Sequence, residues 1–310
     1  MRSSAGMLAC VVSGILGCGG DPDPGDGSGS SDDLPPPAQG FQIVTPTIEL
    51  APGTEATYCY YTRIPVSETV GVKQWRSKMT PGSHHMIVYF TQTEQQPEGT
   101  LTTSGCGGGL GVWAFSAQEP DVQFVMPPGV GITVPASQPA FIQMHYLNVT
   151  DQAVPVHVTL NAETYAPAES YTPASAFITY NSQISIPMGT PGNPGRASAG
   201  GSCDVPPDAS FFSVSTHAHK QAVHTEVTDG ASTVFSSEDW EHPGGVLLSG
   251  APFLTFASGK LSYRCDYENP TGRVIQDGSS AVTDEMCMAV GYFFPATRPT
   301  LCLNSTAFPL

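Results

Sequence analysis

The amino-acid sequence predicts an all-β protein built from antiparallel β-sandwiches. Short runs rich in β-branched and aromatic residues recur along the chain, and Gly, Pro, Asn or Asp bounds each run, as expected for strands joined by turns. The chain contains 33 Gly and 29 Pro among its 310 residues, and no segment keeps a helical period beyond two turns. Long helices are therefore not expected, and regularly spaced strands with turn signals favour sandwiches.

The predicted strands fall into two groups on either side of a Pro- and Ala-rich stretch at 164–175. This stretch is the best internal boundary, so we expect two β domains of similar size, at 41–165 and 170–310. The strands of the first group span residues 41–50, 84–90, 140–149 and 154–163, and those of the second group span 177–187, 211–219, 222–230, 259–269 and 286–294.

The N-terminus is predicted to be an export signal. Arg2 supplies a basic start, and the apolar run GMLACVVSGIL is too short to cross a bilayer as a stop-transfer helix. It ends in ILGC, which resembles a bacterial lipobox, so we expect a lipoprotein signal peptide at 1–18 with Cys18 as the lipidated residue. An ordinary signal peptide cut nearby is the alternative. Residues 19–40, rich in Gly, Pro, Ser and Asp, predict a flexible tether.

Charge and cysteine usage narrow the class of protein. The formal net charge is -16 with only 11 Lys and Arg, which argues against a nucleic-acid partner because phosphate binding needs clustered cations. Beyond the signal region an even number of cysteines remains, which favours disulfides in an oxidising compartment. No two of them form a C-x-x-C pair, so metal ligands are expected among His, Met and carboxylates.

Several histidines stand in patterns typical of a metal centre. His217 and His219 lie two apart in a predicted strand, which places both imidazoles on one face. Buried imidazoles need partners for their ring nitrogens, and a metal ion supplies one. His84 and His85 are adjacent, so they can share a metal only at a strand end or bulge. The Pro-Gly turn just before them permits such an irregularity.

His145 and Met286 complete the candidate set. A thioether is a soft ligand that favours Cu(I), and imidazole serves both copper oxidation states. Taken singly, paired histidines are more often surface or hydrogen-bonded core groups, and a single Met is more often core. Five imidazoles and a thioether in one exported chain favour a metal protein. We expect structural roles for the other histidines: His157 on a solvated face, and His224 and His242 without a partner.

Four motifs carry a resemblance to a known family. SHHM, QMHY, HAH and DEMC follow one another within a stretch that runs from about residue 58 to 302. In this order and spacing they resemble the copper type II, ascorbate-dependent monooxygenases, which include peptidylglycine α-hydroxylating monooxygenase and dopamine β-monooxygenase. The resemblance implies two jelly-roll-like β-sandwich domains packed side by side, each holding one copper, with a solvent-filled cleft between them.

The resemblance also implies roles for the matched residues. The copper that stores and delivers an electron would be held by His84, His85 and His145. The copper that activates oxygen would be held by the catalytic set of His217, His219 and Met286. Gln143 would orient groups around the first copper. The implied disulfides are Cys59–Cys106, Cys203–Cys302 and Cys265–Cys287.

The chain departs from the family where the substrate is bound. Peptide-amidating members have an Arg two residues before the His-x-His pair, where this chain has Ser215. They also have Asn and Tyr soon after the liganding Met, where Met288 and Val290 stand. A peptidylglycine substrate is therefore not expected. The expected function is hydroxylation of a C–H bond in a small organic substrate, with O2 and ascorbate or a similar donor, by a bacterial envelope lipoprotein of the periplasm or outer membrane surface.

Two other functions stay open at this stage. One is a copper-binding envelope lipoprotein that has the ligands but no turnover. Against it, the chain lacks Met-rich repeats and divides into one His-only and one His/Met set. The other is a carbohydrate-binding or adhesion module with incidental histidines, whose function would survive replacement of His217 and His219. In each case the membrane is reached only through the lipid anchor.

Overall fold

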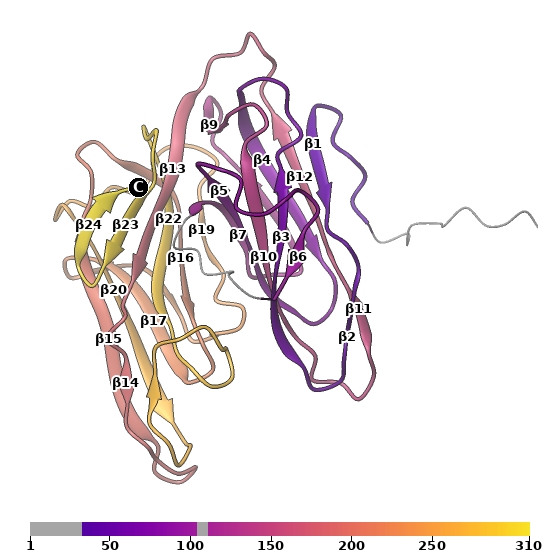
Figure 1. Cartoon of the computed structure of the whole chain (residues 1–310). Helices are drawn as coiled ribbons and strands as arrows, with labels where there is room; N and C mark the ends of the chain where they lie inside the picture. Colours follow the sequence, from indigo (N-terminus) through magenta and orange to yellow (C-terminus); the bar gives the residue numbers. More distant parts are fainter. Residues whose placement is uncertain (1–32, 104–110) are drawn as a thin grey trace, which may run out of the picture. The chain divides into compact units, whose positions relative to one another are not determined.

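The computed structural model describes residues 33–103 and 111–310. Every regular element in these ranges is a β-strand (Figure 1), which confirms the all-β prediction. None of the described residues forms a helix that is long and apolar enough to cross a membrane. The signal peptide predicted at 1–18, its Cys18 and most of the tether lie outside the described residues.

Strands of the first half belong to two sheets that bury one hydrophobic core. The five-stranded sheet has the order β6 (Leu101–Thr102), β3 (Glu55–Arg63), β10 (Pro139–Leu147), β5 (Ser83–Thr91) and β7 (Gly111–Ala117). To an eleven-stranded sheet this half contributes β1 (Gly40–Val44), β12 (Val158–Thr164), β4 (Val70–Met79), β9 (Val130–Val134) and β8 (Asp121–Val125). The indole of Trp75 on β4 stacks on Phe115 of β7, with ring centroids 5.5 Å apart, and so joins the two sheets.

The second half is built in the same way around a second core. It adds to the eleven-stranded sheet β13 (Thr172–Tyr180), β22 (Cys287–Phe294), β16 (Ser210–Ala218), β19 (Gly245–Leu247), β23 (Thr300–Leu303) and β24 (Thr306–Pro309). Its own four-stranded sheet consists of β15 (Gly195–Asp204), β20 (Lys260–Asn269), β17 (Ala222–Asp229) and β18 (Ser232–Ser237). The remaining strands pair as β2 (Ile48–Leu50) with β11 (Val154–Val156) and β14 (Ser185–Ile186) with β21 (Ile275–Gln276).

Strand β22 explains why the run CMAVGYFF is almost wholly apolar. Met288, Val290 and Tyr292 belong to the core of the first half, whereas Ala289 and Phe293 belong to the core of the second half. Successive side chains of a strand point to opposite faces, so this strand is buried on both. A strand covered on both faces needs a continuous apolar run and not an alternating one.

The eleven-stranded sheet continues through the boundary predicted at 164–175. β13 begins inside that stretch and pairs in parallel with β9, with Thr172 opposite Val130. The buried residues form two hydrophobic cores, and the first of these also takes in residues of the second half, such as Phe212 and Val290. Because one sheet is shared, the division into domains at 41–165 and 170–310 stays a prediction.

The folded body begins before residue 40, where the tether was predicted to end. The side chain of Leu34 is only 7% exposed. Its carbonyl accepts a hydrogen bond from Nε2 of Gln42, and the carbonyl of Pro35 accepts one from Nδ2 of Asn161, both at 2.8 Å. These contacts fix the segment before β1 on the body, because an apolar Leu34 and two backbone acceptors find partners there. The tether prediction is therefore too long at its C-terminal end.

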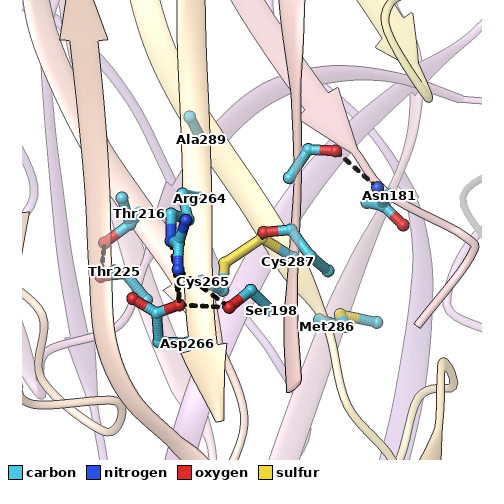
Figure 2. The surroundings of a disulfide bond; sticks show 12 residues. Asn181, Ser198, Thr216, Thr225, Arg264, Cys265, Asp266, Met286, Cys287 and Ala289 are labelled. Carbon is cyan, nitrogen blue, oxygen red and sulfur yellow. Dashed lines mark hydrogen bonds and ion pairs between the residues drawn. A yellow bond between two sulfur atoms is a disulfide. The ribbon is translucent and has the colours of Figure 1, made fainter. Parts of the chain in front are cut away.

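Two of the three predicted disulfides are present. Cys203 is bonded to Cys302, and Cys265 to Cys287. Figure 2 shows the second bond and Met286, the residue that precedes Cys287. The bonds indicate an oxidising, exported environment. The third pairing, Cys59–Cys106, stays a prediction, since Cys106 lies outside the described residues.

We expect the two disulfides to differ in their contribution to stability. They close loops of 99 and 22 residues, and loop-closure entropy gives roughly 4.7 and roughly 3.4 kcal/mol respectively. Urea unfolding of the Cys203→Ala/Cys302→Ala and Cys265→Ala/Cys287→Ala variants measures both. A larger loss for the Cys265–Cys287 pair would show that local packing outweighs loop closure.

Candidate metal centre

A β-bulge brings His84 onto the same side of the five-stranded sheet as its neighbour. In the pairing of β10 with β5, His145 lies opposite His85, but the next residue, Tyr146, lies opposite Ser83. His84 is therefore the extra residue of a bulge, which re-aims its side chain. The two imidazoles contact each other, with their Nδ1 atoms 3.0 Å apart. The structure thus contains the bulge that the adjacent His84 and His85 need if they are to share a metal ion.

The second set of ligands comes from the register of β16 and β22. His217 of β16 lies opposite Met288 of β22, and Ala218 lies opposite Cys287. Continuing this register by one residue places His219 opposite Met286. Because side chains alternate along a strand, these four groups lie on the face that β22 turns towards the first half.

The structure brings the five histidines of both predicted ligand sets into one cluster. Ring centroids of His84, His85 and His145 lie 5.0 to 5.2 Å from one another. The ring of His217 lies 5.3 Å from that of His85, and the ring of His219 lies 6.1 Å from that of His84. The resemblance implied that a solvent-filled cleft separates the sets. Here the imidazoles of the two halves are in contact, and all five are buried.

Three of these imidazoles donate one ring N–H to an acceptor. Nε2 of His145 lies 3.0 Å from Oε1 of Glu55, Nδ1 of His219 lies 3.2 Å from the carbonyl oxygen of Asp284, and Nδ1 of His217 contacts Oε1 of Gln118. The Gln118 amide is oriented by its Nε2, which donates to the carbonyl of Thr216 at 3.2 Å. Each acceptor holds the proton on the nitrogen it faces, so the opposite nitrogen carries a lone pair.

The lone-pair nitrogens are those that a metal ion would use. Nδ1 of His145, Nε2 of His219 and Nε2 of His84 are buried without a hydrogen-bond partner. A buried polar atom without a partner is costly, and a histidine that ligates a metal characteristically gives its other N–H to a carboxylate or carbonyl. Donor nitrogens of His84, His85 and His145 lie within 4.8 Å of one another. These residues therefore fit a metal ion.

Electrostatics keep the cluster neutral and ready to ligate. Burial lowers the pKa of all five imidazoles, and neighbouring histidines lower the pKa of several further. The pKa of His84 falls to about 3 and that of His219 to about 4. Neutral imidazole is the form that binds metal, so protons compete with a metal at these residues only in acid.

Glu285, in the DEMC motif, is a positioning residue whose role the motif alone does not indicate. Its carboxylate is fully buried and accepts backbone N–H bonds from His219 at 3.0 Å, Gln221 at 2.6 Å and Met286 at 3.3 Å. It thus ties the end of β16 to the start of β22. Burial raises the pKa of this carboxyl to about 7.

Glu55 was missed because nothing near it in the sequence marks it. Its Oε1 faces His145 and also accepts the backbone N–H of Ala281 at 2.8 Å, while its Oε2 accepts the hydroxyl of Ser280 at 2.8 Å. One carboxylate therefore connects a ligand of the first half with the loop that leads to Met286. Glu55 and Ser280 are 225 residues apart in the chain, so only the fold brings them together.

A cavity of about 890 Å³ borders the cluster. His85, His145, His217 and Met286 form part of its wall, together with Gln143, which was predicted to orient groups here. The cavity is within the size range of small-molecule sites. Met286 is only partly buried, and its side chain lines the cavity beside these histidines.

The other three histidines are not part of the buried cluster. His157 is half-buried between β11 and β12, and His224 is half-buried on β17. His242 is exposed, but its charge contributes to the lowered pKa of His84. Trp240 stands 5.5 Å from the ring of His84. The loop at 240–242 therefore approaches the cluster, although no pattern in the sequence indicated this.

Comparisons with known proteins assign no function to this site. No protein-family model and no curated protein matches the chain. The major capsid protein P2 from bacteriophage PM2 aligns at a TM-score of 0.31 and 7% identity, over 82% of this chain and 97% of that one. PNGase F, a glycosylasparaginase from Flavobacterium meningosepticum, aligns at 0.36 and 10%, over 87% and 99%. Both TM-scores are too low to support an argument.

Glu55→Gln is expected to weaken metal binding at the His84, His85 and His145 set. The amide can still accept, but it no longer holds the His145 proton with a negative charge, so we expect a loss of about tenfold in affinity. Metal titration of the purified chain measures it. Glu49→Gln, an identical change at an exposed position of β2, is the matched control. Equal affinities for the two variants would contradict this role.

The metal-free chain should lose stability in acid. The five histidines have a folded-state pKa below the ordinary value of 6.5, so the unfolded chain binds more protons and stability, full above pH 6.5, falls as pH drops towards 4. The raised pKa of Glu285 acts in the opposite direction, because its stability contribution is lost as pH rises through about 7. One carboxyl opposes five imidazoles, so the histidines should dominate.

Urea unfolding at about pH 5 and about pH 7 tests this expectation. The free energy of unfolding should be lower at the acidic pH, and His217→Asn should reduce the difference because the variant has one buried imidazole fewer. A chain equally stable at both values would contradict the argument.

Proposed function

We propose that this protein is a dicopper monooxygenase that hydroxylates a C–H bond of a small organic substrate, with O2 and a one-electron donor such as ascorbate. The observation that carries the proposal is the buried cluster itself. In the imidazoles of His145 and His219, one ring nitrogen faces an acceptor and the other is buried without a partner, and the cluster borders a cavity that the thioether of Met286 also lines.

The donor set favours copper over other metals. Imidazole nitrogens and a thioether sulfur suit copper in both oxidation states, whereas Zn and Fe–S sites more often use thiolates. Among the described cysteines, four are joined in disulfides. Copper bound in this cluster would supply one-electron chemistry and the activation of O2.

The chain's own groups would each have a defined task. His84, His85 and His145 would hold one ion, and His217, His219 and Met286 the other. Glu55, Gln118 and the Asp284 carbonyl would keep protons on the outer nitrogens, and Glu285 would hold the two backbone segments that carry His219 and Met286. The cavity would place the substrate beside His217 and Met286 and limit access of water.

We further propose that the protein is an envelope lipoprotein. The two disulfides support an oxidising compartment. The ILGC sequence that ends at Cys18 and the following Gly- and Pro-rich stretch support a lipid anchor and a tether. Such an anchor would be the protein's contact with the membrane.

Copper stoichiometry is the experiment that tests the proposal. The chain, reconstituted with copper and dialysed, is expected to retain two ions. His84→Ala and Met286→Ala should each lose or weaken one of them, because each removes a ligand from a different set. Met188→Ala, at a position 61% exposed, is the matched control. One ion or none, unaffected by Met286→Ala, would overturn the assignment.

Oxygen consumption separates the enzyme from a copper-binding lipoprotein without turnover. With ascorbate and a screen of small organic compounds, the copper-loaded chain should consume O2 and form a hydroxylated product. The Met286→Ala variant should lose this activity while copper stays at the His-only set. Two bound copper ions without any product would favour the copper-binding alternative.

A further inference from the structure

The cavity beside the histidine cluster is lined largely by apolar and aromatic side chains from both halves of the chain. On β16 and β22, alternate positions face it: Ser213, Ser215 and His217 on one strand lie opposite Tyr292, Val290 and Met288 on the other. From the first half it receives Tyr89, Trp113 and Phe124. Phe124 and Tyr292 meet with ring centroids 4.8 Å apart.

The charges around the cavity are sparse. Among the described residues that line it, none is Lys or Arg, and the one acidic side chain is that of Glu119. Glu119 is half-exposed, so water solvates it and a ligand need not neutralise it. The other polar groups there are amides and hydroxyls, such as those of Gln118, Gln123 and Ser215, together with the imidazoles of the cluster.

We infer that this cavity selects a neutral, largely apolar organic molecule as the substrate; the inference rests on the monooxygenase proposed above. An anionic head group placed in the cavity would lose its hydration without meeting a cation, and burying an uncompensated charge is costly. An ammonium group could pair only with the side chain of Glu119, which is solvated because it is half-exposed. Hydrocarbon, by contrast, gains from contact with the aromatic and aliphatic wall.

The position of the cluster in the cavity wall would also determine which part of the substrate reacts. His85, His217 and Met286 form one part of the wall, and Trp113, Phe124 and Tyr292 form another. A molecule that packs its apolar part on the aromatic rings would present a C–H bond to the cluster. The amides and hydroxyls in the wall can hydrogen-bond a neutral polar group of the same molecule.

Three probes of equal chain length test the inference: n-octanol, octanoate and octylammonium, titrated calorimetrically into the purified, full-length chain without metal. We expect octanol to bind about tenfold more tightly than either ion, because each charged head loses hydration without a partner. Binding to the metal-free chain does not depend on copper. If the copper proposal fails, the binding of these probes can still be interpreted. If the probes fail to bind, the copper measurements can likewise still be interpreted.

A charge placed in the wall gives the matched comparison. Val246 on β19 lines the cavity and is half-buried, so Val246→Arg should raise octanoate affinity several-fold and bring it towards that of octanol. Val274→Arg makes the same change of net charge at a position 45% exposed and outside the wall, and should leave the ratio unchanged.

Three results would overturn the inference. Octanoate binding as tightly as octanol would show that the cavity accepts anions. Octylammonium binding most tightly, with the preference lost in Glu119→Gln, would assign a cationic substrate. Absence of binding by all three probes would show that the cavity does not take an apolar chain.

Discussion

Burial of β22 on both faces is the constraint on which the rest of this structure depends. One face, with Ala289 and Phe293, completes the core of the second half, and the other, with Met288, Val290 and Tyr292, packs against the first half. A two-sided strand needs a partner on each side, so the halves must approach each other. The register with β16 then carries the His-x-His pair to the same contact surface, next to the bulged histidines of β5.

Polar contacts convert this approach into a defined site. Gln118 and Glu55, both from the first half, reach groups of the second half: Gln118 the imidazole of His217, and Glu55 the Ser280–Ala281 segment. Each also controls a ligand, since Glu55 holds the outer nitrogen of His145. The groups that join the halves are thus the groups that set the tautomers. Any movement that separated the halves would also displace these histidines, so the geometry of the cluster depends on the contact between the halves.

Contact between the two ligand sets distinguishes this structure from the separated arrangement that the family resemblance implies. Five neutral imidazoles within one buried cluster are tolerated because burial and mutual repulsion oppose their protonation. Several inner nitrogens are left without partners, a cost that bound cations would remove. The cavity that borders the cluster has no cationic side chain among its described lining residues. Under the proposed function, the metal ligands and the groups that select the substrate would therefore line the same cavity.

The sequence by itself determined the all-β class, the presence of disulfides and the candidate ligands, because apolar runs, cysteine number and the motifs are local patterns. The pairing of the two observed disulfides was implied only by the family resemblance. It did not indicate β15, whose residues are mostly Gly, Ala and Ser; that strand exists because β20 pairs with it along its whole length. Nor could it place Leu34 on the body, assign the bulge to His84, or find Glu55 and Gln118. Those outcomes depend on register and on contacts between residues far apart in the chain, and only the tertiary structure decides them.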